Sequence, residues 1–599
     1  MPNVAEYMLL RLREWGIHRI YGFPGDGINA FLGALENVDK DPFFTQTRHE
    51  EMAAFMACAH AKFTGEIGAC MATSGPGAVH LANGLYDAKL DHQPVIAIVG
   101  QQKRMSVGAH FQQEIDLQSF FKDIGGFVST VMEEHSARHV LDRAIKSALT
   151  ERRPAVVIVP DDVAESEYSD PPRMHGAVLT SVGWNRPHMV PRDDLLREAA
   201  DVLNAGEKVA MLIGQGARGA ADEVMRTAEV LGAGVAKALL GKDVLPDDLP
   251  FVTGAIGLLG TEPTNKMIED CDTLLMVGTS FPYTEWLPKQ GQAKCVEIDI
   301  DGSLIGVRYP TDVCLVGDAK DTLTALLPRL QKKDNRDWRK KIELEVAAWW
   351  KVLDDRAHQK GDPLNPQLPF FELNSRLPDN TIMTSDSGSA TNWWARQVVM
   401  HGDMRASLSG TLATMVPGVP YAISAKFAYP ERPVVAFTGD GAFEMLGMNE
   451  LLTVRKYADE LLSKNPTLIF VVLVNEDLNQ VSFEQRAEAG DPKNPMTQTI
   501  PYVPAAEWAK LLGFEGIKVN RPEDVGPAWD RAFAATKPCL IEFVTDPQIS
   551  PLPPHVRMTQ MKKTAKALVH GDEDAVGVAT KGFKGKLSEL KEHLPGSGG

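Results

Sequence analysis

The sequence lacks the features that mark several common classes of protein. It has no apolar run of about 18 residues, so we expect no membrane span. The N-terminus shows no basic segment followed by an apolar one, so we expect no signal peptide and a cytoplasmic protein. A formal net charge of −17 argues against nucleic-acid binding. The six cysteines form no CxxC pair and lie mostly in apolar runs, which predicts reduced, buried thiols.

The length of 599 residues indicates about three or four domains. Short apolar runs alternate with helical patterns, and this alternation is typical of parallel sheets with helices on both faces. We therefore expect an α/β fold with three doubly wound parallel-sheet domains and a C-terminal tail. The stretch 166–191 carries prolines and polar residues and is predicted to be a linker, while 331–366 is predicted to be a helical connector. The predicted boundaries are 1–165, 192–330, 367–550 and, for the tail, 551–599.

The clearest chemical signal is a pair of predicted strands that end in oxygen ligands. An apolar run, Val434–Phe437, leads into Gly439-Asp440-Gly441, and a helix is predicted over 444–457. A second run, Leu468–Val474, ends at Asn475. If the two strands are neighbours, Asp440 and Asn475 meet at their carboxyl ends. Together with a backbone carbonyl and a diphosphate they would make a Mg²⁺ site, and a helix N-terminus favours phosphate. The alternative is that the tripeptide is only a turn.

A second stretch lowers the weight of that alternative. It runs from Thr47 to Phe55 and includes Glu50 and Glu51; a Thr-Ser-Gly-Pro-Gly turn follows at 73–77. As a set, these motifs resemble the thiamine diphosphate enzymes of the acetolactate synthase and pyruvate oxidase superfamily, and the resemblance covers about 4–554. The pyruvate oxidase branch looks closest, on four segments: GPGAVHLANGLYDA with His80, the pair Phe111-Gln112, GTSFPY at 278–283 and YPTDV at 309–313.

The resemblance implies how thiamine diphosphate and Mg²⁺ would be held. Glu50 would be the buried acid that protonates the pyrimidine ring of the cofactor, and Glu51 is its rival, about 100° away around the helix. Met415 would be the apolar wedge that folds the cofactor into a V. The metal ligands would be Asp440, Asn475 and the carbonyl of Asp477. The gap between Asp440 and Asn475 is longer than is usual, and we expect the extra residues to form a surface loop at 458–466. The other implied cofactor contacts are Pro24, Gly25, Thr73, Gly75, Gly439, Gly441 and Ala442.

On the substrate side, the resemblance implies catalytic roles for residues of both outer domains. Gln480 is a departure, because pyruvate oxidases usually have an aromatic residue there. This difference leaves the natural substrate or acceptor open. The implied residues are Pro24 to Gly27, His80, Phe111, Gln112, Val481 and Glu484.

The predicted middle domain carries a weaker signal for a nucleotide. Its first strand runs into a Gly-Gln-Gly-Ala-Arg turn at 214–218, which resembles the flavin-binding turn of pyruvate oxidases. The alternative is a domain kept as a scaffold after losing flavin, or a plain strand-to-helix turn. The implied FAD contacts are Gly214, Gly216, Arg218, Thr279, Asp299, Asp301, Asp318 and Ala319.

The implied activity is decarboxylation of a 2-oxo acid, with pyruvate as the favoured substrate. FAD would then oxidise the enamine that remains after CO2 leaves, to give acetate or acetyl phosphate. One alternative is an acetolactate synthase-like carboligase or another non-oxidative lyase. Another, of a different class, is a catalytically weak binding or assembly protein. The resemblance implies an active site shared between two subunits of a homodimer, and the assembly of such dimers into a homotetramer.

The tail carries no matched motif. Its short apolar stripe, Leu587, Leu590 and Leu594, would be a packing helix or, less in keeping with the sequence, a membrane-surface anchor. We expect that residues from Gly571 onward can be removed without loss of fold or activity.

Overall fold

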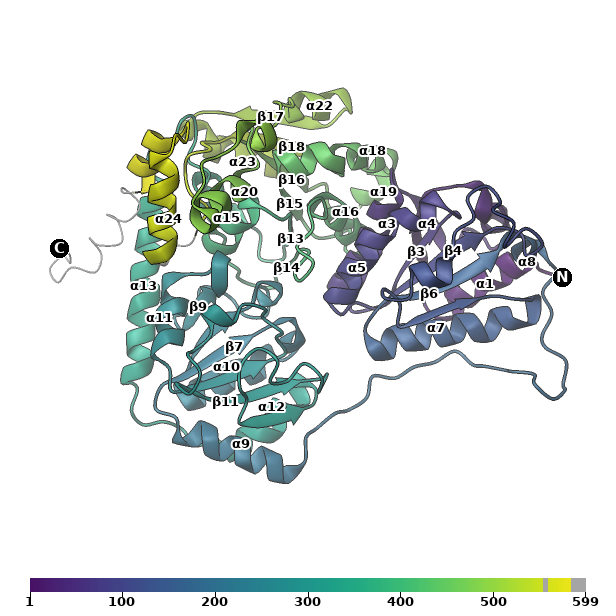
Figure 1. Ribbon diagram of the computed structural model, residues 1–599, viewed down its shortest axis with the longest axis horizontal. Helices are drawn as coiled ribbons and strands as arrows, with labels where there is room; N and C mark the ends of the chain where they lie inside the picture. Colours follow the sequence, from purple (N-terminus) through teal and green to yellow (C-terminus); the bar gives the residue numbers. More distant parts are fainter. Residues whose placement is uncertain (553–557, 583–599) are drawn as a thin grey trace.

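The computed structural model describes residues 1–552 and 558–582 as three α/β lobes (Figure 1). Each lobe is built on a six-stranded sheet whose strands are all parallel. In Figure 1 the first lobe lies on the right, the middle lobe below and the third lobe above, with helices on both faces of each sheet. The predicted fold class is confirmed.

The first sheet has the strand order β2-β1-β3-β4-β6-β5. Its elements are α1 (Val4–Glu14), β1 (Arg19–Gly22), η1 (Asp26–Ile28), α2 (Asn29–Asn37), β2 (Phe43–Gln46), α3 (Glu50–Thr64), β3 (Gly68–Ala72), α4 (Pro76–His80), α5 (Ala82–Leu90), β4 (Val95–Gln101), α6 (Leu117–Phe120), β5 (Phe127–Thr130), η2 (Glu134–Ser136), α7 (Ala137–Glu151), β6 (Ala155–Pro160) and α8 (Asp161–Glu165).

The middle sheet has the order β12-β11-β10-β7-β8-β9. Its elements are α9 (Asp193–Ala205), β7 (Val209–Ile213), η3 (Gln215–Ala217), α10 (Ala221–Leu231), β8 (Gly234–Lys237), η4 (Leu239–Gly241), β9 (Val252–Ala255), η5 (Gly257–Leu259), α11 (Glu262–Asp270), β10 (Thr273–Val277), η6 (Thr284–Trp286), β11 (Lys294–Asp299), β12 (Val313–Val316), α12 (Ala319–Leu326) and η7 (Leu327–Arg329).

The third sheet has the order β14-β13-β15-β16-β18-β17. Its elements are α14 (Leu368–Leu373), η8 (Asn374–Arg376), β13 (Ile382–Ser385), α15 (Ser389–Gln397), β14 (Arg405–Ser407), α16 (Gly418–Ala428), β15 (Val434–Gly439), α17 (Asp440–Ala442), the π-helix η9 (Phe443–Gly447), α18 (Met448–Lys456), α19 (Ala458–Leu461), β16 (Leu468–Val474), α20 (Asn479–Glu484), the π-helix η10 (Gln485–Ala489), α21 (Pro495–Gln498), α22 (Ala505–Leu511), β17 (Glu515–Val519), η11 (Pro522–Asp524), α23 (Val525–Phe533) and β18 (Cys539–Val544).

Two long segments connect the lobes. Residues 166–192 contain no helix or strand and cross from the first lobe to the middle lobe in Figure 1, as predicted for a linker. The connector helix α13 (Asp337–Ala357) runs along the edge of the molecule in Figure 1, and α24 (Met558–Val569) packs against η10 of the third lobe. The stripe Leu587, Leu590 and Leu594 lies outside the described residues. Within 1–552 and 558–582, no helix combines the length and the hydrophobicity that a membrane crossing needs.

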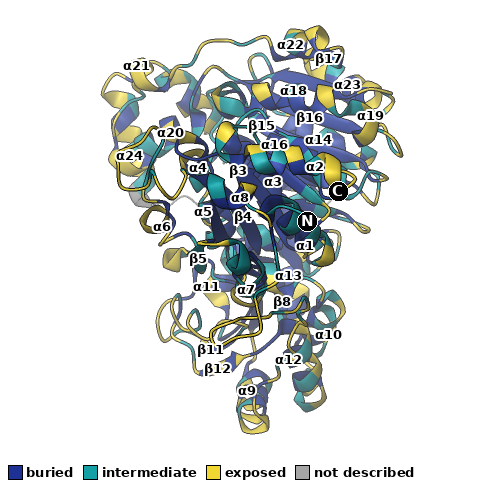
Figure 2. Ribbon diagram, turned by 90° about the vertical axis from the view of Figure 1, so that its right-hand side faces the viewer, coloured by how far each residue is buried: buried dark blue, intermediate teal, exposed yellow. Residues whose placement is uncertain are grey.

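The first and third lobes share one hydrophobic core. Helix α3 is buried on nearly all sides, and α16 packs against it through Ser424, which donates to the Met56 carbonyl, and Tyr421, which contacts Phe55 and Cys58. Figure 2 colours the strands β15 and β16 of the same core as buried. Because Glu50 is the first residue of α3, its position is fixed by this core.

Three local predictions were wrong. The helix predicted from Glu444 begins at Asp440, so the glycine-rich turn is itself the first helical turn. The predicted loop 458–466 begins with the helix α19, because Leu461 is buried in the shared core. Cys314 is exposed, because it lies on the edge strand β12, where only alternate residues face the core; the other five cysteines are buried and all six are free.

Candidate active site

The predicted metal ligands meet at the carboxyl edge of the third sheet. Strands β15 and β16 pair in parallel, with Gly439 beside Leu473, so the residues that follow each strand are neighbours. Asp440 Oδ2 accepts hydrogen bonds from the backbone N–H groups of Asn475 and Glu476, both at 2.7 Å. The predicted meeting of Asp440 and Asn475 is therefore confirmed.

Asp440 has the environment of a carboxylate that needs a positive partner. Its side chain is buried, and burial raises the pKa of this carboxyl to about 7. Its backbone donors lower the pKa but do not cancel the effect of burial. A divalent cation bound to Asp440 would stabilise the charged form, and the nearby oxygen atoms are of the type that Mg²⁺ prefers.

The third predicted ligand, the carbonyl of Asp477, already accepts a hydrogen bond from Asn479 N at 2.7 Å. A carbonyl oxygen has two lone pairs, so this bond leaves one position for a cation. The Asp477 side chain turns away into the protein, where Ser482, Asn479 and Lys493 surround it. Its roles as ligand and as structural anchor thus belong to different atoms.

The predicted wedge, Met415, lies next to the glycine-rich turn. A Cβ atom on Gly441 would stand 3.5 Å from Met415 Cε and 2.8 Å from Leu478. The backbone around Met415 is strained, because Ala413 and Val416 have positive φ angles of 53° and 91°. Gly439 and Ala442, the other predicted contacts of this turn, flank Asp440 and Gly441 on β15 and α17.

Asp386 holds this strained loop, and the sequence analysis missed it. Its side chain is completely buried and accepts a hydrogen bond from Val416 N at 2.7 Å, and others from Ser387 N and Thr438 Oγ1. Burial raises the pKa of this carboxyl to about 7. The available signal was an aspartate directly after the short segment Ile382–Ser385, a weaker form of the strand-then-aspartate pattern that identified Asp440, because only Ile382 and Met383 of this strand are apolar.

In the first lobe, Glu50 and His80 form a contact pair. His80 Nδ1 lies 2.9 Å from Glu50 Oε2, and the His49 and His80 rings stack with their centroids 4.3 Å apart. His49 caps α3, because its Nδ1 accepts from Glu51 N, and burial, followed by the charge of His80, lowers the pKa of His49. Gly77 must be small, since a Cβ atom there would lie 3.1 Å from Glu50 Oε1.

Glu51 has a different set of neighbours. Asn83 Nδ2 donates to Glu51 Oε1 at 2.8 Å and to Thr414 Oγ1 at 3.0 Å, which ties α3 to the Met415 loop of the same chain. Within the described residues, no hydrogen bond joins Glu50 or His80 to the Asp440 turn. Glu51 is held by Asn83 within the protein, whereas the hydrogen bonds described for Glu50 come only from His80. This difference favours Glu50 as the carboxyl that is available to a ligand.

The other predicted residues of the first lobe gather around the same turn. Gly25 and Thr73 are in close contact, and Gly27 N donates to Thr73 Oγ1 at 2.9 Å. Pro24 precedes Gly25, and Gly75 has a φ of 60°, which permits the turn. Phe111 and Gln112 are exposed; the residue of their loop that contacts the turn is Gln113, which accepts from Ser74 Oγ at 3.3 Å.

The predicted flavin residues converge at the carboxyl edge of the middle sheet, after β7, β10, β11 and β12. Gly214 and Gly216 pack against the backbone of Gly278, so no larger residue fits at either position. A Cβ atom on Gly214 would also meet Thr279. These contacts explain the glycines of this turn without a ligand.

The charged residues of this edge divide into two groups. Arg218 joins the lobes, because it pairs with Asp243 and donates to the carbonyls of Leu240 and Ala406. Asp318 caps α12, which begins at the buried Ala319, and pairs with Arg186 of the linker. Asp299 accepts from Asp301 N at 2.9 Å, and burial raises the pKa of Asp299. Arg152, the exposed residue that follows α7 of the first lobe, lies near enough to Arg186, Arg218, Asp299 and Asp318 to interact with their charges.

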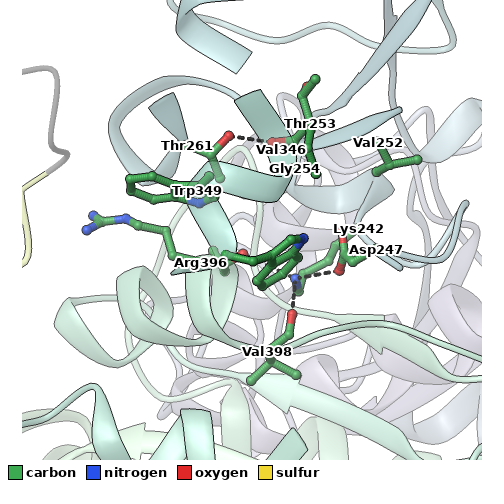
Figure 3. A pocket seen from close by; sticks show the side chains of 12 residues that line it. Lys242, Asp247, Val252, Thr253, Gly254, Thr261, Val346, Trp349, Arg396 and Val398 are labelled. Carbon is green, nitrogen blue, oxygen red and sulfur yellow. Dashed lines mark hydrogen bonds and ion pairs between the residues drawn. The ribbon is translucent and has the colours of Figure 1, made fainter. Parts of the chain in front are cut away.

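A small cavity lies away from these sites, between the middle and third lobes (Figure 3). Its volume of about 10 Å³ is about that of one water molecule, so it is too small for a substrate. Lys242 points at Asp247 and at the Val398 carbonyl there, and burial lowers the pKa of Lys242 to about 8. This lysine is a structural link between lobes.

Comparison with known proteins finds one family in all three lobes. Residues 2–120 match the thiamine pyrophosphate enzyme N-terminal TPP binding domain, 196–326 the central domain and 386–543 the C-terminal TPP binding domain. Thiamine pyrophosphate and thiamine diphosphate are the same molecule.

Full-length relatives carry different names. A putative thiamine pyrophosphate-containing protein YdaP of Bacillus subtilis is 35% identical, over 95% of this chain and 96% of its own length. A pyruvate oxidase of Lactiplantibacillus plantarum is 29% identical over 89% of this chain and 87% of its own length. A probable acetolactate synthase large subunit of Methanocaldococcus jannaschii is 30% identical, over 93% and 94%.

Proposed function

Because this chain belongs to the thiamine pyrophosphate enzymes, we propose that it decarboxylates a 2-oxo acid, with pyruvate as the reference substrate, and passes the electrons to FAD. The proposed decarboxylation rests on one observation: Asp440 and Asn475 are in contact where the two paired strands β15 and β16 end. Cofactor sites of α/β proteins lie at such carboxyl edges.

Each part of the cofactor has residues suited to hold it. When bound with Mg²⁺, thiamine diphosphate supplies the carbon nucleophile that attacks the 2-oxo group. Asp440, Asn475 and the Asp477 carbonyl would hold the metal, and the N-terminus of α17 would face the diphosphate. Met415, presented by the loop that Asp386 holds, would support the rings.

The Glu50–His80 pair would handle protons. Glu50 would hold a proton against the pyrimidine nitrogen, and His80 Nδ1 orients the Glu50 carboxyl. Phe111, Gln112, Val481 and Glu484 stay proposed substrate-side residues. Since no hydrogen bond in the described chain joins Glu50 to its own Asp440 turn, we propose that a second subunit supplies the matching half of each site.

Two observations bear on the flavin, in opposite directions. The convergence of Asp299, Asp318 and the cationic residues Arg152 and Arg186 at one sheet edge supports a dinucleotide site. The glycine packing at 214–216 and the interdomain bonds of Arg218 fit a scaffold equally well. The second candidate function is therefore a carboligase like the relatives named acetolactate synthase.

One experiment separates the two functions. The purified protein is denatured and the released cofactors are identified; the intact protein is then mixed with pyruvate without oxygen. Oxidase function predicts bound FAD whose absorbance bleaches only when thiamine diphosphate and Mg²⁺ are present. Bound FAD that stays oxidised while pyruvate is consumed to acetolactate would establish the carboligase, and absence of FAD would exclude the oxidase.

A further inference from the structure

A chain of three polar side chains lies at the same sheet edge as Asp440. Asn392 is on α15, which follows Asp386 and β13; Gln480 and Glu484 are on α20, which follows Asn475 and β16. In the sheet, β13 and β16 flank β15. The elements that carry these residues therefore lie on either side of the Asp440 turn.

Hydrogen bonds fix the direction of the Gln480 amide. Asn392, which is buried, donates from Nδ2 to Gln480 Oε1. Gln480 Nε2 in turn donates to Glu484 Oε1 at 2.8 Å, one helical turn along α20. The amide oxygen must face Asn392 and the nitrogen must face Glu484, because only the oxygen can accept and only the nitrogen can donate.

This arrangement leaves one N–H of Gln480 free. A primary amide nitrogen carries two protons, and Glu484 takes one of them. In the part of the chain that the structure describes, the other has no protein acceptor. Gln480 is only half-buried, and the neighbouring Val481 side chain is 49% exposed, so a small molecule can reach this side of α20.

We propose that Gln480, held by Asn392, determines substrate specificity and selects a 2-oxo acid that carries a hydroxyl group on C3, the carbon on the far side of the 2-oxo group from the carboxylate. This inference rests on the proposed decarboxylase function and narrows its substrate class. When C3 is a methyl group, as in pyruvate, it displaces water from the free N–H and provides no hydrogen-bond acceptor. A hydroxyl group at the same carbon accepts that hydrogen bond, and sites built to bond a hydroxyl discriminate against analogues without one.

The test measures kcat/KM for 3-hydroxypyruvate and for pyruvate, and compares their ratio between variants. Gln480→Met has nearly the same shape without a hydrogen-bonding amide, and Asn392→Leu removes the group that orients it. Gln118→Met is the matched control, because Gln118 lies on the exposed helix α6 and bonds Thr130 there. Thermal unfolding midpoints show whether each variant is folded.

We expect wild type to prefer 3-hydroxypyruvate, and Gln480→Met to lower the ratio about tenfold by losing one hydrogen bond. Asn392→Leu should lower it less, and Gln118→Met should leave it unchanged. If Gln480→Met fails to fold, Gln480→Glu, which lacks the N–H donor, is judged by the same ratio.

Two results would overturn the inference. An unchanged ratio in folded Gln480→Met, with pyruvate still decarboxylated by wild type, would remove the specificity role and leave the proposed function intact. Failure of wild type to decarboxylate either acid, with thiamine diphosphate bound, would remove both.

Discussion

Glu50 and Glu51 are adjacent carboxylates whose surroundings separate them. Glu50 contacts His80, whereas Glu51 is engaged by Asn83, which also bonds Thr414. The sequence could name both residues as candidates but could not choose between them from spacing alone. Their neighbours come from α4, α5 and the 409–416 loop, which only folding brings to the start of α3.

Replacing Glu50 tests the assigned proton role. We expect Glu50→Gln to keep the fold and thiamine diphosphate binding but to lose turnover about 100-fold or more, since it can no longer exchange a proton. Glu51→Gln is the matched control and should keep near-normal turnover, because its amide oxygen can still accept from Asn83. The measurements are steady-state decarboxylation rates and thiamine diphosphate affinities by calorimetry. Equal losses of turnover in both variants would contradict the assignment of the proton role to Glu50.

Glu450 predicts a pH dependence of stability. Its side chain is completely buried, Oε2 accepts from Arg48 N at 3.1 Å, and Oε1 has no partner among the described residues. Burial raises the pKa of Glu450 to about 7. The folded state therefore binds more protons than the unfolded state between about pH 4 and 7, so this group lowers the free energy of unfolding as the pH rises through that window.

Glu450→Gln removes this titration and keeps an acceptor for Arg48 N. We expect wild type to lose on the order of 2 kcal/mol more unfolding free energy than the variant between about pH 5 and pH 8. Urea unfolding of both proteins at the two pH values measures the difference. Parallel pH profiles would show that Glu450 is not the titrating group.

At the scale of elements, the tail differs most from its prediction. The sequence analysis regarded residues from Gly571 onward as removable, because they are polar and match no motif. In the structure, Asp572 and Asp574 pair with Arg486, whose side chain is 1% exposed, and Lys493 N also donates to Asp572. Helix α24 packs on η10, the helix that directly follows Glu484. The described part of the tail is therefore packed on the third lobe, which contradicts the premise that it makes no structural contacts.

Removing residues 571–599 should destabilise the enzyme. Arg486 would remain as a buried charge without its partner, which typically costs about 3–5 kcal/mol. We expect a lower thermal midpoint and faster proteolysis near 485–494. Removal of 583–599 alone is the control, because it leaves in place the ion pairs of Arg486 with Asp572 and Asp574. If both truncations unfold at the wild-type temperature, the pairing with Arg486 has no net stabilising effect.

At the scale of the whole molecule, the first and third lobes are locked together within one chain. Lys62 pairs with Asp91, both of which are buried, and Asp91 accepts from the backbone N–H groups of Gly410 and Thr411. Tyr421 also hydrogen-bonds Asp87 across this junction. These contacts between the two lobes hold Glu51 near Thr414, but in the described residues Glu50 makes no hydrogen bond to the Asp440 turn of the same chain.

This geometry predicts that two inactive variants complement one another. Glu50→Gln damages one half of each shared site and Asp440→Ala the other, so in a two-fold mixed dimer one site carries both lesions and the other none. After joint refolding or co-expression, we expect roughly a quarter of wild-type activity. Each variant alone is the control. Activity no higher than the average of the two would mean that each chain builds its own site.

The sequence by itself determined the α/β class, the strands that carry the site, and the pairing of Asp440 with Asn475. These follow from short apolar runs ending in glycine and oxygen ligands, because parallel strands place their carboxyl ends on one edge of the sheet. Only the tertiary structure decided the contacts of Asp386, the different neighbours of Glu50 and Glu51, the burial of Asp572 and the direction of the Gln480 amide. Each of these depends on a partner far away in the chain, such as Val416 for Asp386 and Arg486 for Asp572. Local patterns carry no information about such contacts, because tertiary packing brings together segments that are distant in the sequence.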